Sequence, residues 1–173
     1  TGLIQDDEEQ LENKKIGVIL GKAETEESVD RIAGLKDGLE GSGCEILWEY
    51  NYARGNQNTS EIIASKKQVD YLVILDNWAL EEVGEAAEEN KYHGAKIYGV
   101  GSSEKAIVLL DNQNIECLVV PDDYETGYMS MNEIAKKLRH SFYKMNSCET
   151  EVRIINKEDL YSKDLERFLY SYE

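Results

Sequence analysis

Short apolar runs alternate with amphipathic stretches from Lys14 to Asp122. The apolar runs predict five β-strands at residues 15–20, 45–50, 71–75, 96–100 and 115–120. Three of the runs are nearly continuous in apolar residues, which is typical of strands covered on both faces. The segments between them are long enough for crossover helices, and such connections join parallel strands. We therefore predict an α/β fold: a three-layer, doubly wound parallel sheet with strand order 2-1-3-4-5.

The apolar periodicity also predicts the helices. They are expected at residues 26–40, 59–67, 80–92, 103–110 and 124–145. A sixth strand is expected at 151–155, followed by a turn and a final polar helix. In the first helix the predicted inward side chains are Val29, Ile32, Ala33, Leu35 and Leu39, and in the third they are Val83, Ala86 and Ala87.

The domain organisation is simple. Residues 1–13 contain the acidic run Asp6–Glu9 and are predicted to form an N-terminal arm or linker, whereas residues 14–173 form one domain of ordinary size. The first residue is Thr1 rather than methionine, so we expect the natural protein to have an upstream part. No stretch of the sequence approaches the length of a membrane span.

The charge narrows the range of partners. With 35 acidic and 19 basic residues, the formal net charge is −16. This charge repels a phosphate backbone and argues against nucleic-acid binding by this domain. The three cysteines follow no metal-ligand spacing, and Cys44 and Cys117 are expected to act as small buried apolar groups. We predict neither a metal nor a cofactor.

Sequence signatures of catalysis are missing. The chain has no P-loop, no Gly-x-Gly-x-x-Gly after the first strand and no Gly-x-Ser-x-Gly elbow. The two histidines, His93 and His140, lie at or near predicted helix ends, where an imidazole interacts favourably with the helix dipole. These absences favour ligand binding over enzymatic activity.

The fold class itself predicts where a ligand binds. In an open parallel sheet small molecules bind beyond the carboxyl ends of the strands. The loops there contain two aromatic rings that can stack on a ligand, and amide, hydroxyl and carboxylate groups that suit a polar solute. The predicted ligand-binding residues are Arg31, Tyr52, Asp76, Asn77, Trp78, Ser102, Ser103 and Asp122.

Most of these residues also have a purely structural interpretation. Asn77 and Ser103 are typical helix N-caps, and Asp76 is suited to capping a turn. Arg31 lies four residues after Glu27, a spacing that favours a surface ion pair on a helix. Trp78 is the strongest candidate, because a large ring in a polar loop needs something to cover it.

Several segments resemble one family. Residues 16–19, 31–35, 69–74, 95–101 and 114–120, together with Tyr124-x-x-Gly127-Tyr128, are similar to the C-terminal lobe of type I periplasmic binding proteins and lac-repressor-like regulators. The resemblance runs from Lys14 to Asp159. It implies a lobe that closes with a second lobe around a sugar, a nucleoside or a similar solute. The chain would be the C-terminal lobe alone, without the N-terminal lobe or a DNA-binding headpiece.

The resemblance also assigns roles to particular positions. Arg31 matches an arginine that often contacts the ligand, and Asp76 or Asn77 matches the polar residue at the end of the third strand. Ser103 stands where many sugar binders have an aspartate, and Pro121 where they often have a glutamine. These two departures weaken the expectation of hexose or pentose specificity.

Three functions remain open at this point. The leading hypothesis is a solute-binding lobe of an extracytoplasmic protein that delivers its ligand to a membrane transporter, such as an ABC transporter, or to a receptor. The second is the effector lobe of a cytoplasmic transcription regulator, and an upstream helix-turn-helix segment would select it. The third is a receiver-like signalling domain, with Asp76 after the third strand as its candidate phosphorylation site. The acidic pair that such a domain needs after the first strand is missing, because Gly21 and Lys22 stand there. A homodimer through an exposed face is a further expectation.

Overall fold

The computed structural model describes residues 12–22, 25–55, 58–87, 90–163 and 165–169, so most of the predicted N-terminal arm lies outside the described residues. One sheet has the order β2-β1-β3-β4-β5-β6. Its strands are β1 (Lys15–Leu20), β2 (Glu45–Asn51), β3 (Tyr71–Ile74), β4 (Lys96–Val100), β5 (Cys117–Pro121) and β6 (Val152–Asn156). The first five are parallel, which confirms the predicted order, and β6 pairs antiparallel with β5 at one edge.

The helices follow the predicted sequence with changed ends. They are α2 (Glu26–Leu39), α3 (Thr59–Ala64), α4 (Asn77–Ala87), α5 (Glu104–Asp111), α6 (Asp123–Arg139), the 3-10 helix η2 (Lys157–Tyr161) and α7 (Glu166–Leu169). Helix α4 begins three residues earlier than predicted, because the Asp76 side chain accepts a hydrogen bond from the Ala79 amide and starts the helix there. Within the described residues, the part of the predicted final polar helix that is seen is one turn, α7, in which Phe168 and Leu169 are buried.

Helices α3, α4 and α5 cover one face of the sheet. The core on this side contains fully buried side chains from both layers: Leu72, Ile74, Leu80, Val83, Ile97, Leu110, Leu118 and Ile155. Val83 is therefore inward as predicted. This well-packed face fixes α4 and α5, whose first turns lie at the carboxyl ends of β3 and β4.

The opposite face is only partly covered. Helix α2 packs over β1 and β3, but the adjoining surface of β4, β5 and β6 lines an apolar cavity of about 410 Å³. Of the predicted inward residues of α2 only Leu35 is buried, while Val29 and Ala33 are exposed. That part of the prediction is wrong, because no described element packs beside α2 on this face.

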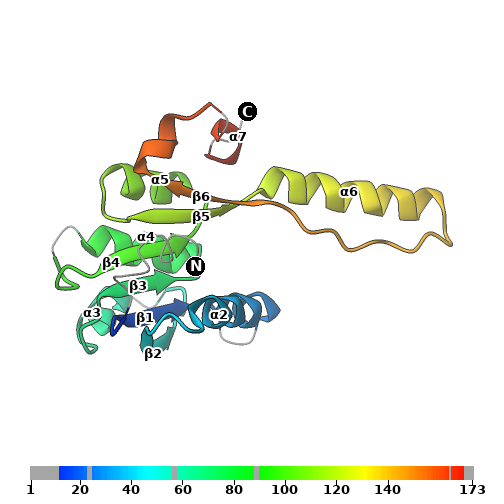
Figure 1. Ribbon diagram of the computed structural model, residues 1–173. Coiled ribbons are helices and arrows are strands. Elements are labelled where there is room, and N and C mark those ends of the chain that lie inside the picture. Colours follow the sequence, from blue (N-terminus) through cyan, green and yellow to red (C-terminus); the bar gives the residue numbers. More distant parts are fainter. Residues whose placement is uncertain (1–11, 23–24, 56–57, 88–89, 164, 170–173) are drawn as a thin grey trace.

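Helix α6 projects from the body of the domain, and the chain returns from its far end to β6 (Figure 1). Exposed apolar side chains follow one another along α6 and the turn after it; we call these residues the α6 stripe. They are Tyr124, Tyr128, Met131, Ile134, Leu138, Phe142 and Met145. Leu138 is 82% exposed. Apolar residues at three- and four-residue intervals are typical of a helix face that packs against another element.

The turn after α6 is held by Glu133. Its carboxylate accepts hydrogen bonds from the Asn146 amide (2.9 Å), the Tyr143 hydroxyl (2.9 Å) and the Lys136 ammonium (2.6 Å). These contacts lower the pKa of Glu133 from 4.5 to about 2. The hydrogen bond from the Asn146 amide has the largest effect, and the hydrogen bond from Lys136 has the next largest. The charged carboxylate therefore ties residues 143–146 back to the helix.

We expect this turn to loosen in acid. The pKa of Glu133 is lower in the folded state than in the unfolded state. The stabilisation that its charged carboxylate gives the fold is therefore complete above pH 4.5 and is lost as the pH falls through about 2. The amide shift of Asn146 in NMR spectra should titrate with that low pKa. In Glu133→Gln, which keeps the shape but not the charge, this titration should disappear. An Asn146 titration near pH 4.5 in the unmodified protein would contradict the assigned contacts.

Candidate functional site

The carboxyl ends of the parallel strands meet at one edge of the sheet, which we call the strand-end edge. Backbone hydrogen bonds join the loops there: the Tyr52 amide donates to the Leu20 carbonyl (2.8 Å), and the Gly101 amide donates to the Val119 carbonyl (3.1 Å). The parallel registers of β1 to β5 bring the loops with the predicted residues to this edge. The topology thus gathers residues that are far apart in sequence.

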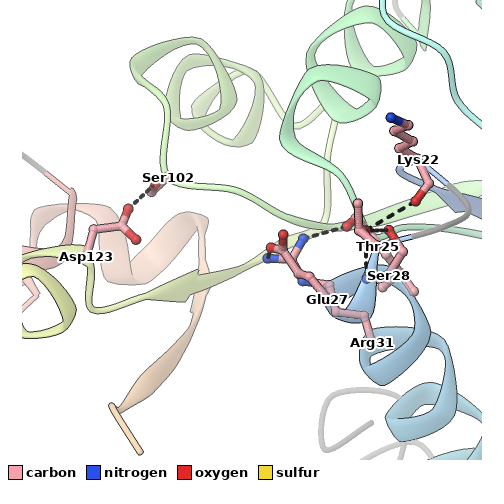
Figure 2. A network of polar contacts seen from close by, with 8 residues as sticks. Lys22, Thr25, Glu27, Ser28, Arg31, Ser102 and Asp123 are labelled. Atoms are coloured by element: carbon pink, nitrogen blue, oxygen red, sulfur yellow. Dashed lines mark hydrogen bonds and ion pairs between the residues drawn. The ribbon is translucent and has the colours of Figure 1, made fainter. Parts of the chain in front are cut away.

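Arg31 reaches the strand-end edge from α2. Its Nη1 donates to the Leu75 carbonyl at 2.7 Å, directly after β3, and its Nη2 pairs with Glu27 at 2.5 Å. Figure 2 shows Arg31 and Glu27 beside Thr25, which caps α2 by accepting from the Ser28 amide. Arg31 therefore contacts the strand-end edge and forms the surface ion pair with Glu27 at the same time.

Several predicted polar side chains serve as helix caps. Ser103 caps α5 through the Ala106 amide (3.2 Å), and Asp122 caps α6 through the Glu125 amide (2.8 Å). Asp122 is also buried, at 5% exposure. Asn77 is not a cap: its Nδ2 donates to Glu81, and its Oδ1 accepts from the Ser103 amide at 3.4 Å. These contacts fix the loops after β3 and β4 relative to each other.

The loop after β4 is also tied to α6. The Ser102 hydroxyl donates to the Asp123 carboxylate at 2.9 Å, and Figure 2 shows this pair apart from the Arg31 network. Ser102 is half-buried, so its hydroxyl lies at the surface of the strand-end edge. A hydroxyl and a carboxylate here can exchange hydrogen bonds with a polar ligand.

The two predicted stacking rings differ in accessibility. Tyr52 is 8% exposed within the larger core cluster, and burial and then Glu82 raise the pKa of its hydroxyl to about 12. Trp78 is 47% exposed, and the guanidinium carbon of Arg54 lies 3.7 Å from its ring centroid. Of the two rings, only Trp78 offers substantial exposed surface.

Arg54 was not among the predicted ligand-binding residues. The only sequence signal for it is its place, three residues after the end of β2 and hence at the same edge. Among the described residues there is no group of three or more metal-ligating side chains, and Cys44, Cys117 and Cys148 are free thiols. No helix in the described ranges is both long and apolar enough to cross a membrane.

A family model described as a periplasmic binding protein domain matches residues 5–141. No curated protein matches the chain significantly. Solved structures share the fold. An ABC transporter solute binding protein from Agrobacterium vitis, with bound D-fucose, has a TM-score of 0.80 and 18% identity, and the match covers 98% of this chain and 59% of that one.

Two further solved structures have a similar shape, with slightly lower TM-scores. A carbohydrate transporter solute binding protein from Agrobacterium radiobacter, in complex with D-arabinose, has a TM-score of 0.77 and 19% identity over 91% of this chain and 56% of that one. A glucose-galactose binding protein from Geobacillus stearothermophilus has a TM-score of 0.77 and 19% identity over 92% of this chain and 58% of that one. The chain thus spans less than two thirds of each of these structures.

Proposed function

The chain belongs to the periplasmic binding protein domain family, and from this premise we propose that it is a solute-binding lobe that holds a small polar, sugar-like ligand at its strand-end edge without chemical conversion. The observation that carries the proposal is the match to this family, together with sugar-bound structures of the same fold. The exposed ring of Trp78 and the hydroxyl of Ser102 supply the stacking surface and the hydrogen bonding that a sugar requires.

A second lobe completes the proposed site. The chain covers 56–59% of the solved structures described above, so a partner lobe of comparable size can form the opposite wall. Helix α6 leaves the body directly after β5, beside the strand-end edge, and carries the unburied α6 stripe. We therefore assign the α6 stripe to contact with that second lobe. Without it, the ligand would be held from one side only.

The wider role follows from the family. We propose that the complete protein is extracytoplasmic and passes its ligand to a membrane transporter or a receptor. The three solved structures described above are solute-binding proteins, so they lend no support to the transcription-regulator alternative. The receiver-like alternative gains no support either, since the Asp76 carboxylate, its candidate phosphorylation site, is engaged in capping α4.

The proposal is tested by NMR titration of the chain with D-fucose, D-arabinose and D-galactose. We expect weak, saturable shifts of the Trp78 indole and of the Ser102 and Ser103 amides, and none at Val119 on the open sheet face. Trp78→Ala should remove the shifts of the Ser102 and Ser103 amides. Tyr161→Ala, a change at another exposed aromatic residue, should keep them. Absence of shifts with all three sugars, or shifts centred on Val119, would contradict the proposal.

A further inference from the structure

Building on the proposed function, we propose that Arg54, held against Trp78, makes the strand-end edge select an anionic ligand, namely a sugar acid or a similar small solute with a carboxylate. Arg54 follows β2, and Trp78 lies in the first turn of α4, after β3. Strands β2 and β3 flank β1 in the sheet. The pair therefore bridges the loops of two strands that are not neighbours.

The contact orients the guanidinium group. With its central carbon 3.7 Å from the ring centroid, the group is in van der Waals contact with the face of Trp78 and is attracted by the ring electrons. A guanidinium group carries five N–H donors at its rim, and these remain available when its face is covered by a ring. The ring contact thus holds the arginine without a hydrogen bond from its guanidinium group to any other described residue.

The neighbouring carboxylates are engaged elsewhere. Glu82 accepts from the Tyr52 hydroxyl and from the Thr59 amide (3.2 Å), and Asp76 accepts from the Ala79 amide (2.9 Å). No carboxylate among the described residues forms an ion pair with Arg54. The N–H donors of the Arg54 guanidinium are therefore available to a ligand. The acceptor that best matches two parallel N–H donors is a carboxylate, because its two oxygens can accept both hydrogen bonds at once.

A neutral sugar fits this arrangement less well. To stack on Trp78 it must share the ring with Arg54 or displace it, whereas a sugar acid can lie beside the ring and direct its carboxylate to the guanidinium rim. The net charge of −16 does not prevent this. At physiological ionic strength the Debye length is about 8 Å, so distant acidic residues are screened while a direct ion pair is not.

The test compares D-galacturonate with D-galactose, which differ only in the carboxylate at C6. The chain has two tryptophans and therefore two indole N–H signals. The Trp48 indole donates to the Lys67 carbonyl at 2.9 Å and serves as an internal reference. At constant ionic strength, we expect the Trp78 signal to report a Kd about tenfold lower for galacturonate than for galactose, the scale of one charge-assisted contact.

Two variants separate the contribution of Arg54 to galacturonate binding from the effect of removing any positive charge from the protein. Arg54→Gln should raise the Kd for galacturonate about tenfold. Lys66→Gln is the matched control, because Lys66 also lies over aromatic rings, those of Trp48 and Tyr50, away from Trp78; it should leave the Kd unchanged. An unchanged Trp48 signal in Arg54→Gln shows that the fold is intact.

The outcomes distinguish this inference from the proposed function. Equal Kd values for the two sugars in the unmodified chain, or an unchanged galacturonate Kd in Arg54→Gln, would overturn the anion selectivity and leave the solute-binding proposal standing. A Trp78 signal that responds to neither sugar would overturn both. A stronger response to galacturonate that depends on Arg54 supports both.

Discussion

Replacing Leu80 by alanine should lower the free energy of unfolding by about 2–5 kcal/mol, whereas the same change at Leu138 should alter it by less than about 0.5 kcal/mol. Leu80 is completely buried between α4 and β4, where its loss leaves a cavity and removes apolar surface from the core. Leu138 on α6 is 82% exposed, so its removal leaves no cavity. Urea unfolding of both variants measures the difference.

This pair of variants also tests the position of α6. Should Leu138→Ala prove as costly as Leu80→Ala, α6 must pack against something in solution, either the open sheet face or a second copy of the chain. That result would contradict a projecting helix. In the longer protein that contains the proposed second lobe, we expect the opposite behaviour, namely that Leu138→Ala becomes strongly destabilising because the α6 stripe is then buried.

The second large expected effect is on stability, when either of two glycines is replaced by alanine, and its sign should differ between them. A Cβ atom at Gly99 would lie 2.7 Å from Leu80 Cδ2 and closer still to its Cδ1, so Gly99→Ala overpacks the contact between β4 and α4 and should cost about 1–3 kcal/mol. Gly34 lies inside α2, and apart from its chain neighbours and its own helix backbone no atom of the described residues lies within 4 Å of the position of a Cβ. Gly34→Ala should therefore stabilise the chain by about 0.5–1 kcal/mol through its higher helix propensity.

If α4 packs closely on β4 and Gly34 is open to solvent, thermal unfolding should show a lower Tm for Gly99→Ala and a higher Tm for Gly34→Ala. Gly99→Ala should also move the Trp78 indole signal, because Leu80 and Trp78 share the first turns of α4. Destabilisation by both variants would show that α2 is covered in solution by something beyond the described residues. Stabilisation by both would contradict the close approach of α4 to β4.

Much of the fold is predictable because its signals are local. Continuous apolar runs such as residues 71–75 indicate strands covered on both faces, and the crossover lengths then require parallel pairing. Residues that cap helices, such as Thr25 and Ser103, mark where α2 and α5 begin. The inward face of α2 was partly mispredicted because periodicity shows which residues are apolar, not whether another element covers them. Val29 is apolar, in phase and still exposed.

The candidate site is predictable in place but not in detail. Topology alone brings the loops after the strands to one edge, yet residue type does not show whether Asp122 caps a helix or binds a ligand. The Tyr52 hydroxyl is hydrogen-bonded to Glu82, a residue of α4 thirty positions away. The contact of Arg54 with Trp78 joins loops after two strands that are not adjacent in the sheet. Such contacts depend on tertiary packing, so no local pattern indicates them.

The central claim is that this chain forms one wall of a site whose other wall belongs to a second lobe. Isothermal titration of the chain alone with the sugars and sugar acid named above tests it most directly. Half of the ligand contacts and the exclusion of water are missing, so we expect Kd values no tighter than about 1 mM. The complete two-lobed protein should bind its ligand far more tightly. A micromolar Kd for this chain by itself would contradict the claim.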